Sequence, residues 1–168
     1  AGTTSDALIV GGLPFAAGRS TEEFNGISWS TGGNYFDQIS NNSVFGNSTT
    51  TITSATGIQY DAPSGPTIVN TYNYDGLAWN RTGDMVSPRI YGAGMGSQTS
   101  GLVIGGQGGT TGTVMNVESF NGFAWSTGNN VPTPDGGLRP GAAGSTTTGI
   151  ASISADFPNN FNYHYELN

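Results

Sequence analysis

The apolar residues of this chain come in short runs, three or four residues long, separated by stretches rich in glycine, serine, threonine and asparagine. No segment keeps the 3.6-residue apolar period of an amphipathic helix, and glycine or proline interrupts every candidate. Runs of this length bounded by turn-forming residues are typical of β-strands, and they fall far below the ~20 apolar residues that cross a bilayer. The sequence therefore predicts an all-β fold with essentially no helix and no membrane insertion.

The apolar runs recur along the chain. LIVGG at 8–12 returns as LVIGG at 102–106, and weaker copies begin at Ile58 and Ile150. The starts at 8, 58, 102 and 150 are 50, 44 and 48 residues apart. Each strong copy ends in a glycine doublet, which allows close backbone packing or a sharp turn. These doublets are Gly11 with Gly12 and Gly105 with Gly106.

A second motif keeps nearly the same spacing. It reads FNGISW at 24–29, YDGLAW at 74–79 and FNGFAW at 120–125. Asn-Gly and Asp-Gly tolerate the positive φ of a type I′ turn, so each copy predicts a tight hairpin with its aromatic residue and its Trp on paired strands. We expect the three Trp to occupy equivalent, largely buried positions. The repeated positions are Gly26, Gly76 and Gly122 in the turns and Trp29, Trp79 and Trp125 after them.

A third motif precedes the apolar run, RIYGAG at 89–94 and RPGAAG at 139–144. With all three motifs in one order, one repeat contains four predicted strands, at 90–98, 101–105, 114–121 and 123–126. Segments such as 32–47 and 127–138 connect one repeat to the next. Four strands in roughly 44–50 residues is the size of a propeller blade. The sequence thus predicts one β-propeller-like domain over residues 1–168, with about 3.5 four-stranded repeats.

An apolar strand, a glycine doublet, and then an aromatic residue and a Trp at fixed spacing resemble the kelch-type β-propeller repeat. The aromatic residue and the Trp are only five positions apart here. This short form is similar to the kelch-like repeats of marine-phage virion proteins and bacterial surface proteins. The resemblance covers nearly the whole chain and implies an architecture rather than an activity, because propellers carry many unrelated functions.

The charge balance narrows the possible functions. Only 9% of the residues are charged, the net charge is −7, and the four basic residues are all Arg. A chain this acidic lacks the basic surface that neutralises phosphates, so we expect no nucleic-acid partner. Without Lys there is no P-loop and no Schiff base, and without Cys there is no disulfide or thiolate nucleophile. We expect no cofactor.

The sequence offers little material for catalysis or metal binding. His164 is the only His, and it alternates with tyrosines in a predicted strand. Glu22 and Glu23 are adjacent, so on a strand their side chains point to opposite faces and cannot act as a carboxylate pair. The chain contains no Asp-x-Asp-x-Asp-Gly calcium loop. We therefore predict no catalytic residue and no metal site, and a protein that is not an enzyme.

Two groups of residues are candidates for ligand binding. Arg89 and Arg139 precede the same predicted strand in successive repeats. Each either hydrogen-bonds the segment that links two repeats or presents its guanidinium to an anionic ligand. The three Trp either pack in the core or stack on sugars.

The sequence favours a non-enzymatic structural or adhesive module, most simply a phage virion component that decorates a capsid or forms part of a tail or fibre. The alternative is a soluble or surface carbohydrate-binding lectin. The expected partners are other virion or surface proteins, further copies of the chain, and host glycans. The expected location is a virion or an extracellular surface.

The repeats do not add up to a standard ring, because the chain opens at the tail of a first strand and stops within a third strand. Three arrangements would protect the open edge. The two ends combine into a compact four-bladed ring, two chains share seven blades, or the edge docks onto another protein. Edge pairing favours an oligomer or a larger particle over a free monomer.

Overall fold

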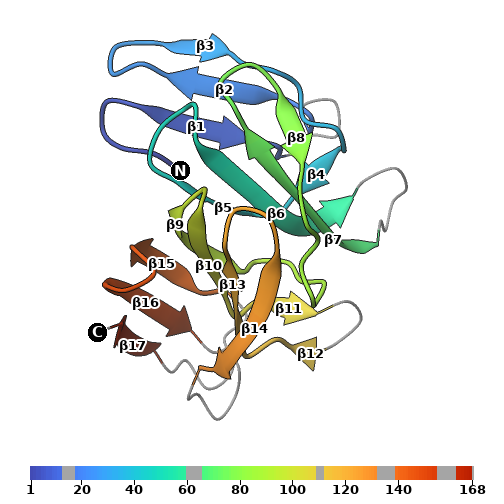
Figure 1. Ribbon diagram of the computed structural model, residues 1–168, viewed down its shortest axis with the longest axis vertical. Helices are drawn as coiled ribbons and strands as arrows, with labels where there is room; N and C mark the ends of the chain where they lie inside the picture. The colour runs from blue at the N-terminus through green and yellow to red at the C-terminus, as the bar shows by residue number, and fades with distance from the viewer. Residues whose placement is uncertain (13–17, 60–65, 109–111, 132–138, 155–161, 168) are drawn as a thin grey trace.

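The computed structural model describes residues 1–12, 18–59, 66–108, 112–131, 139–154 and 162–167 (Figure 1). Every regular element in these ranges is a β-strand, and the strands form five sheets in which all pairings are antiparallel. The all-β prediction is therefore confirmed. The same ranges contain no helix with the length and apolar character needed to span a membrane.

Four of the sheets follow one another along the chain, and we call them units 1 to 4. Unit 1 contains β1 (Ala7–Val10), β2 (Thr21–Phe24) and β3 (Trp29–Thr31). Unit 2 contains β5 (Ser43–Gly46), β6 (Ile52–Gln59), β7 (Thr67–Tyr74) and β8 (Trp79–Arg81), with β4 (Ile39–Ser40) also paired to β6. Unit 3 contains β9 (Ala93–Ser97), β10 (Ser100–Ile104), β13 (Asn116–Phe120) and β14 (Trp125–Asn130). Unit 4 contains β15 (Gly141–Gly144), β16 (Gly149–Ser154) and β17 (Asn162–Leu167). The fifth sheet is the small pair β11 (Gln107–Gly108) and β12 (Gly112–Thr113).

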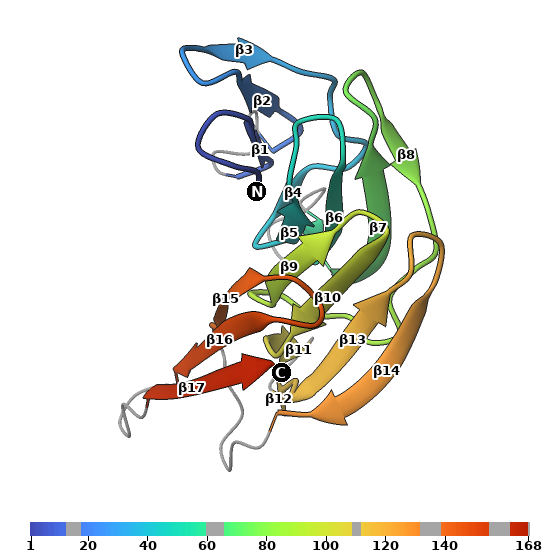
Figure 2. The ribbon, with the colours of Figure 1, turned by 60° about the vertical axis from the view of Figure 1, so that its left-hand side comes forward.

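The units are arranged along an arc (Figure 2). The first strands of units 2, 3 and 4 lie side by side, with β9 between β5 and β15. In units 2 and 3 the later strands follow outward, so that β8 and β14 lie on the outer side of the arc. In units 2 and 3 one face of the sheet therefore lies toward the preceding unit and the other toward the following unit. We call these the leading and trailing faces, and we use the same names for the equivalent faces of units 1 and 4.

The strand registers define which positions are equivalent between units. Ala7, Ile52, Gly101 and Gly149 all pair with the last residue of the next strand of their unit. The apolar runs therefore start at the equivalent residues Leu8, Thr53, Leu102 and Ile150, which are 45, 49 and 48 positions apart. The predicted start at Ile58 is wrong, because the second copy begins five residues earlier on a threonine.

The second copy is hard to recognise in the sequence because it lacks the glycine doublet of the other two copies. Gly11 and Gly12 have positive φ, as do Gly105 and Gly106. In unit 2 the corresponding left-handed pair is Thr56 with Gly57, at φ 57° and 128°. A β-branched residue rarely adopts this conformation. Here the buried Thr56 hydroxyl donates to the carbonyls of Ile68 and Arg89 and accepts from the Arg89 backbone N–H, which offsets the strain.

The turn after each aromatic residue differs from the predicted type I′ hairpin. Phe24 pairs with Trp29, which leaves four residues in the loop, and only Gly26 has positive φ. The Asn25 side-chain oxygen accepts from the backbone N–H groups of Ile27 and Ser28. Asp75 and Asn121 make the same two bonds in units 2 and 3. The Asx side chain thus closes the loop, so Asn and Asp are needed as acceptors and not for a left-handed backbone.

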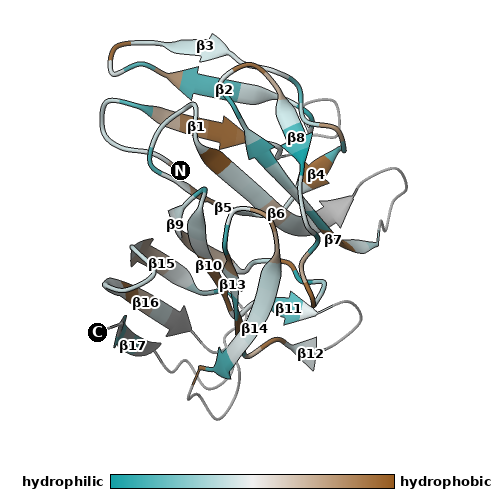
Figure 3. Ribbon diagram, viewed as in Figure 1, coloured by the Kyte–Doolittle hydropathy of each residue, from teal (hydrophilic) through white to brown (hydrophobic). Residues whose placement is uncertain are grey.

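The hydrophobic core is divided among three clusters that lie between successive units. The first joins Leu8 and Val10 of unit 1 to the aromatic residues of unit 2, and the second joins Ala55 of unit 2 to Phe120 and Trp125 of unit 3. The third joins Ile104 of unit 3 to Ala151 of unit 4. Hydrophobic positions along the ribbon accordingly concentrate in strands such as β1 and β4 (Figure 3). Packing between units, rather than within one sheet, holds the arc together.

Candidate functional site

Two of the three repeated Trp connect one unit to the unit before it. Trp79 is 2% exposed, and its indole N–H donates to the Thr21 hydroxyl of unit 1 across 2.8 Å. Trp125 is 9% exposed and makes the same bond to Thr71 of unit 2 at 2.9 Å. Thr21 and Thr71 are equivalent residues, three positions before the aromatic residue of their strand. Each junction therefore satisfies the buried indole with a hydroxyl on the trailing face of the preceding unit.

Trp29 has no such partner within the described residues. Its side chain is 49% exposed, and it packs against Phe24 with the ring centroids 5.1 Å apart. The prediction that all three Trp are largely buried is wrong for this residue. The reason is its place in the arc, because no described unit precedes unit 1 to cover its leading face (Figure 2).

The other positions of this face repeat the same contrast. Ile9 is 53% exposed, whereas its equivalent Val103 in unit 3 is completely buried. Glu22 is exposed, whereas its equivalent Glu118 is completely buried. We call Ile9, Glu22, Phe24 and Trp29 the open leading face. In each of the next two units the same set of positions makes an interface.

The buried Glu118 shows how that carboxylate position is satisfied. Glu118 accepts hydrogen bonds from the backbone N–H groups of Val86 and Ser87, in the segment that links units 2 and 3. It also forms a buried ion pair with Arg89 of the same segment. The Arg89 guanidinium further donates to the carbonyls of Gly105 and Asn116 and to the Asn116 side-chain oxygen. Burial lowers the pKa of Arg89, and the Glu118 carboxylate opposes that shift.

Arg89 is therefore excluded as a ligand-binding residue, because it has no exposed surface and its donors serve the link between units. Arg139 differs, since it is exposed and its guanidinium lies 4.5 Å above the centre of the Tyr91 ring. The strand registers align Gly96 with Gly144. Arg89 lies seven residues before that glycine and Arg139 five, so the two Arg do not occupy equivalent register positions.

The acidic pair predicted to point in opposite directions does so. Glu22 is exposed on the leading face of unit 1, while Glu23 accepts a 2.5 Å hydrogen bond from the Tyr74 hydroxyl of unit 2. Desolvation and this bond to Glu23 raise the pKa of Tyr74. His164, the only histidine, is exposed on β17. Across the described part of the chain, no three His, Asp or Glu side chains gather in a way that could hold a metal ion.

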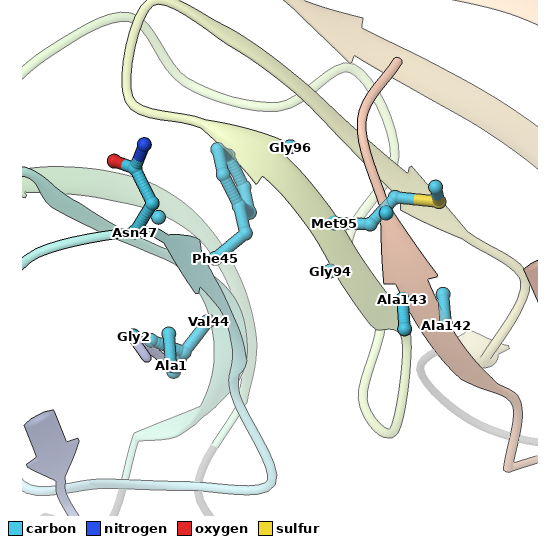
Figure 4. A pocket seen from close by; sticks show the side chains of 12 residues that line it. Ala1, Gly2, Val44, Phe45, Asn47, Gly94, Met95, Gly96, Ala142 and Ala143 are labelled. Atoms are coloured by element: carbon cyan, nitrogen blue, oxygen red, sulfur yellow. The ribbon is translucent and has the colours of Figure 1, made fainter. Parts of the chain in front are cut away.

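A groove of about 360 Å³ runs where the innermost strands of the four units meet (Figure 4). Its walls come from residues 1–2, 44–47, 94–96 and 142–144, so every unit contributes one segment. Most of these residues are glycine or alanine, and Phe45 and Met95 are the large side chains. Gly2, Gly46, Gly96 and Gly144 all have positive φ and occupy equivalent positions, because they pair with Ala7, Ile52, Gly101 and Gly149, respectively.

A second pocket of about 270 Å³ lies at the junction of units 1 and 2. It is lined mostly by polar residues, namely Ser5, Asp6, Glu23, Phe24, Asn25, Ser30 and Thr49. At the next junction Gln98 reaches the carbonyls of Ile52 and Tyr74, which are the equivalents of Ala7 and Phe24. The residue of unit 2 equivalent to Gln98 is Ser48, whose side chain is shorter.

No protein-family model matches the chain, and no curated protein matches it at a significant level. The proposed function therefore rests on the contacts and the exposure of the residues described above. Sequence reasoning identified the three Trp and the repeated glycines but missed Thr21 and Thr71. The only signal for these two acceptors is a threonine three residues before the aromatic residue in two of the copies.

Proposed function

We propose that this chain is a non-enzymatic structural or adhesive module of a virion or of an extracellular surface, and that its four sheets form part of a β-propeller. The observation that carries the proposal is the open leading face of unit 1. The equivalent faces of units 2 and 3 are interfaces, with the same Trp buried and hydrogen-bonded. A face built to the same pattern and left half-exposed fits a protein that works by assembly.

The use of charge in the described residues also supports a structural role. The fully buried ion pair between Arg89 and Glu118 links two units. The Asp75 carboxylate closes a turn, and the Asp6 carboxylate accepts the Thr49 backbone N–H of the neighbouring unit. These groups hold the repeats in place.

The proposed location rests on the resemblance of the short repeats to those of marine-phage virion and bacterial surface proteins. The composition agrees with it, because a chain with few charges, no Lys and no Cys suits a particle that is exposed to proteases and oxidants. The proposed roles are capsid decoration or a part of a tail or fibre, and the partners are virion or surface proteins.

Immunogold electron microscopy of the source culture, with an antibody raised against the purified chain, tests this proposal. We expect label on particles or on the cell envelope. Pre-immune serum and antibody saturated with the purified chain serve as controls. Label confined to the cell interior would overturn the proposal.

The polar pocket between units 1 and 2 favours a second candidate, a carbohydrate-binding lectin. Its hydroxyl, amide and carboxylate side chains match the hydrogen-bonding groups of a sugar, and the half-exposed Trp29 offers an apolar surface on the same unit. A glycan array separates the two functions. A lectin would bind a defined glycan class and lose that binding on Ser30→Ala and Trp29→Ala, whereas a purely structural module would bind none.

A further inference from the structure

Unit 4 has a second open face. It is the trailing face of its sheet, whereas the open face of unit 1 is a leading face. The register pairs Ile150 with Glu166 and Ser152 with His164, so these residues share the trailing face of the sheet. Ile150 is 54% exposed, whereas its equivalent Leu8 in unit 1 is 1% exposed beneath unit 2. We call Ile150, Ser152, His164 and Glu166 the open trailing face.

His164 occupies the position of the tryptophan acceptors. It lies three residues before Leu167, as Thr21 lies before Phe24 and Thr71 before Tyr74. In unit 3 the equivalent residue is Val117, which has no acceptor and packs with the cluster beneath unit 4, where the described residues supply no Trp. Among the described residues, Trp29 is an indole donor without an acceptor, and His164 is a polar side chain at an acceptor position.

We propose that the open leading face of unit 1 binds the open trailing face of unit 4 in a second copy of this chain. Trp29 Nε1 donates to the His164 imidazole, and Ile150 packs on Trp29 and Ile9 as Leu8 packs beneath unit 2. Both halves of the contact are present on one molecule, and each copies half of an interface formed twice within the chain. This inference names the partner of the face on which the proposed function rests.

Two carboxylates, those of Glu166 and of Glu22 in the partner copy, weaken the proposed contact. Glu166 is equivalent to Glu23, which accepts from the Tyr74 hydroxyl. The corresponding aromatic residue of unit 1 is Phe24, which has no hydroxyl to offer. Glu166 therefore stays solvated at the rim, with Glu22 of the partner copy on the facing side. Because these carboxylates repel each other, added salt should strengthen the association.

The contact is head-to-tail, so a copy bound through unit 1 still has unit 4 available. Two copies close a ring if their arcs match, and otherwise the copies continue as an open series. Sedimentation velocity of the full chain over a range of concentrations measures this. We expect species of two or more chains, each of 17.2 kDa. A 17.2 kDa monomer at every concentration would overturn the inference.

Complementation between two variants tests the polarity of the contact. Trp29→Arg damages only the leading face and Ile150→Asp only the trailing face, so each variant alone should be monomeric. Their equimolar mixture should form a complex of one copy of each, because one intact face of each kind remains. Restored binding also shows that both variants are folded. Leu77→Asp, at a turn tip that is 85% exposed and outside both faces, should assemble like the original chain.

Continued assembly of Ile150→Asp alone would contradict the head-to-tail contact. The hydrogen bond has its own test, because His164→Thr supplies the hydroxyl used at the other junctions and His164→Val mimics Val117. We expect His164→Thr to associate about tenfold more tightly than His164→Val, and equal affinities would remove His164 from the contact. A monomeric chain that still labels particles would overturn this inference and leave the proposed function standing. An assembling chain found only inside cells would do the reverse.

Discussion

The indole N–H of Trp79 donates to the hydroxyl of Thr21 across 2.8 Å, although the two residues are 58 positions apart and belong to different sheets. Trp125 and Thr71 repeat this relationship one unit later. Both bonds are buried, so each joins an aromatic cluster of one unit to the trailing face of the unit before it. The contacts between successive units are thus repeated along the chain, as is the sequence motif within each unit.

Replacing Thr71 with Val should destabilise the protein by about 1–3 kcal/mol, because it keeps the shape of the side chain and leaves the Trp125 N–H buried without an acceptor. Thr71→Ser should retain most of the stability, since the hydroxyl remains. Urea unfolding followed by intrinsic fluorescence measures both. If Val and Ser cost the same, the hydrogen bond contributes nothing and shape alone matters.

The Trp residues should differ in their contribution to stability. Trp79→Ala removes a buried ring from the first core cluster and should cost about 3–5 kcal/mol. Trp29→Ala removes a half-exposed ring and should cost less than half as much, at a concentration where the chain is monomeric. Thermal unfolding of the two variants provides the comparison. Equal costs would mean that the leading face of unit 1 is covered in solution.

The local features of the repeat were predictable because their causes are local. The Asx-Gly turn depends on bonds spanning two or three residues, and the aromatic residue and Trp on either side of it follow directly. The exposure of Trp29 was not predictable, since it depends on whether another unit packs on that face. Three copies of one motif therefore contain two buried indoles and one exposed indole.

The predictions that were wrong concern features that depend on residues far apart in the sequence. Thr56 replaces a glycine at positive φ only because its hydroxyl bonds to Ile68 and Arg89, up to 33 positions away. Arg89 and Arg139 look alike in sequence. Their burial differs because Arg89 has a carboxylate partner 29 positions later, in Glu118. A sequence pattern that requires glycine does not recognise Thr56, and an alignment of Arg89 with Arg139 does not reveal that only Arg89 pairs with Glu118.

Breaking the buried ion pair should be costly. Arg89→Met leaves the Glu118 carboxylate buried without its cation and should destabilise the protein by about 3–5 kcal/mol. Arg139→Ala is the matched control, because among the described residues it loses an exposed contact with the Tyr91 ring, and it should cost about 0.5–1 kcal/mol. Chemical denaturation of both variants decides the matter. Similar costs for the two would show that the Arg89 network is not needed to link units 2 and 3.

Close packing between units should be sensitive to a single methyl group. A Cβ on Gly101 would overlap the Phe45 ring of unit 2, and Gly101 lies within β10 at a φ where an added side chain is not itself strained. Gly101→Ala should therefore cost about 1–3 kcal/mol through overpacking. Gly141→Ala in β15 meets no atom within 4 Å and should change stability by less than about 0.5 kcal/mol. Differential scanning calorimetry compares the pair, and an unchanged Gly101→Ala would mean that Phe45 moves aside freely.

The turn of unit 2 should make stability depend on acid in a way that the other two turns do not. Hydrogen bonds from the backbone N–H groups of Ala78 and Leu77, with a further bond from the Asn80 side chain, lower the pKa of Asp75 below its ordinary value. A lowered native pKa means that the unfolded chain binds more protons near pH 4, so this contribution is present above that pH and is lost as the pH falls through the native pKa. Asp75→Asn supplies the acceptor that Asn25 and Asn121 already use. We expect the variant to be slightly less stable than the original chain in urea unfolding at pH 7, because its amide nitrogen cannot accept the bond from Asn80, and to lose less stability between pH 5 and about pH 2.5. An identical pH dependence of the two proteins would show that the Asp75 carboxylate has the same pKa folded and unfolded, and that the turn needs only an oxygen acceptor and no charge.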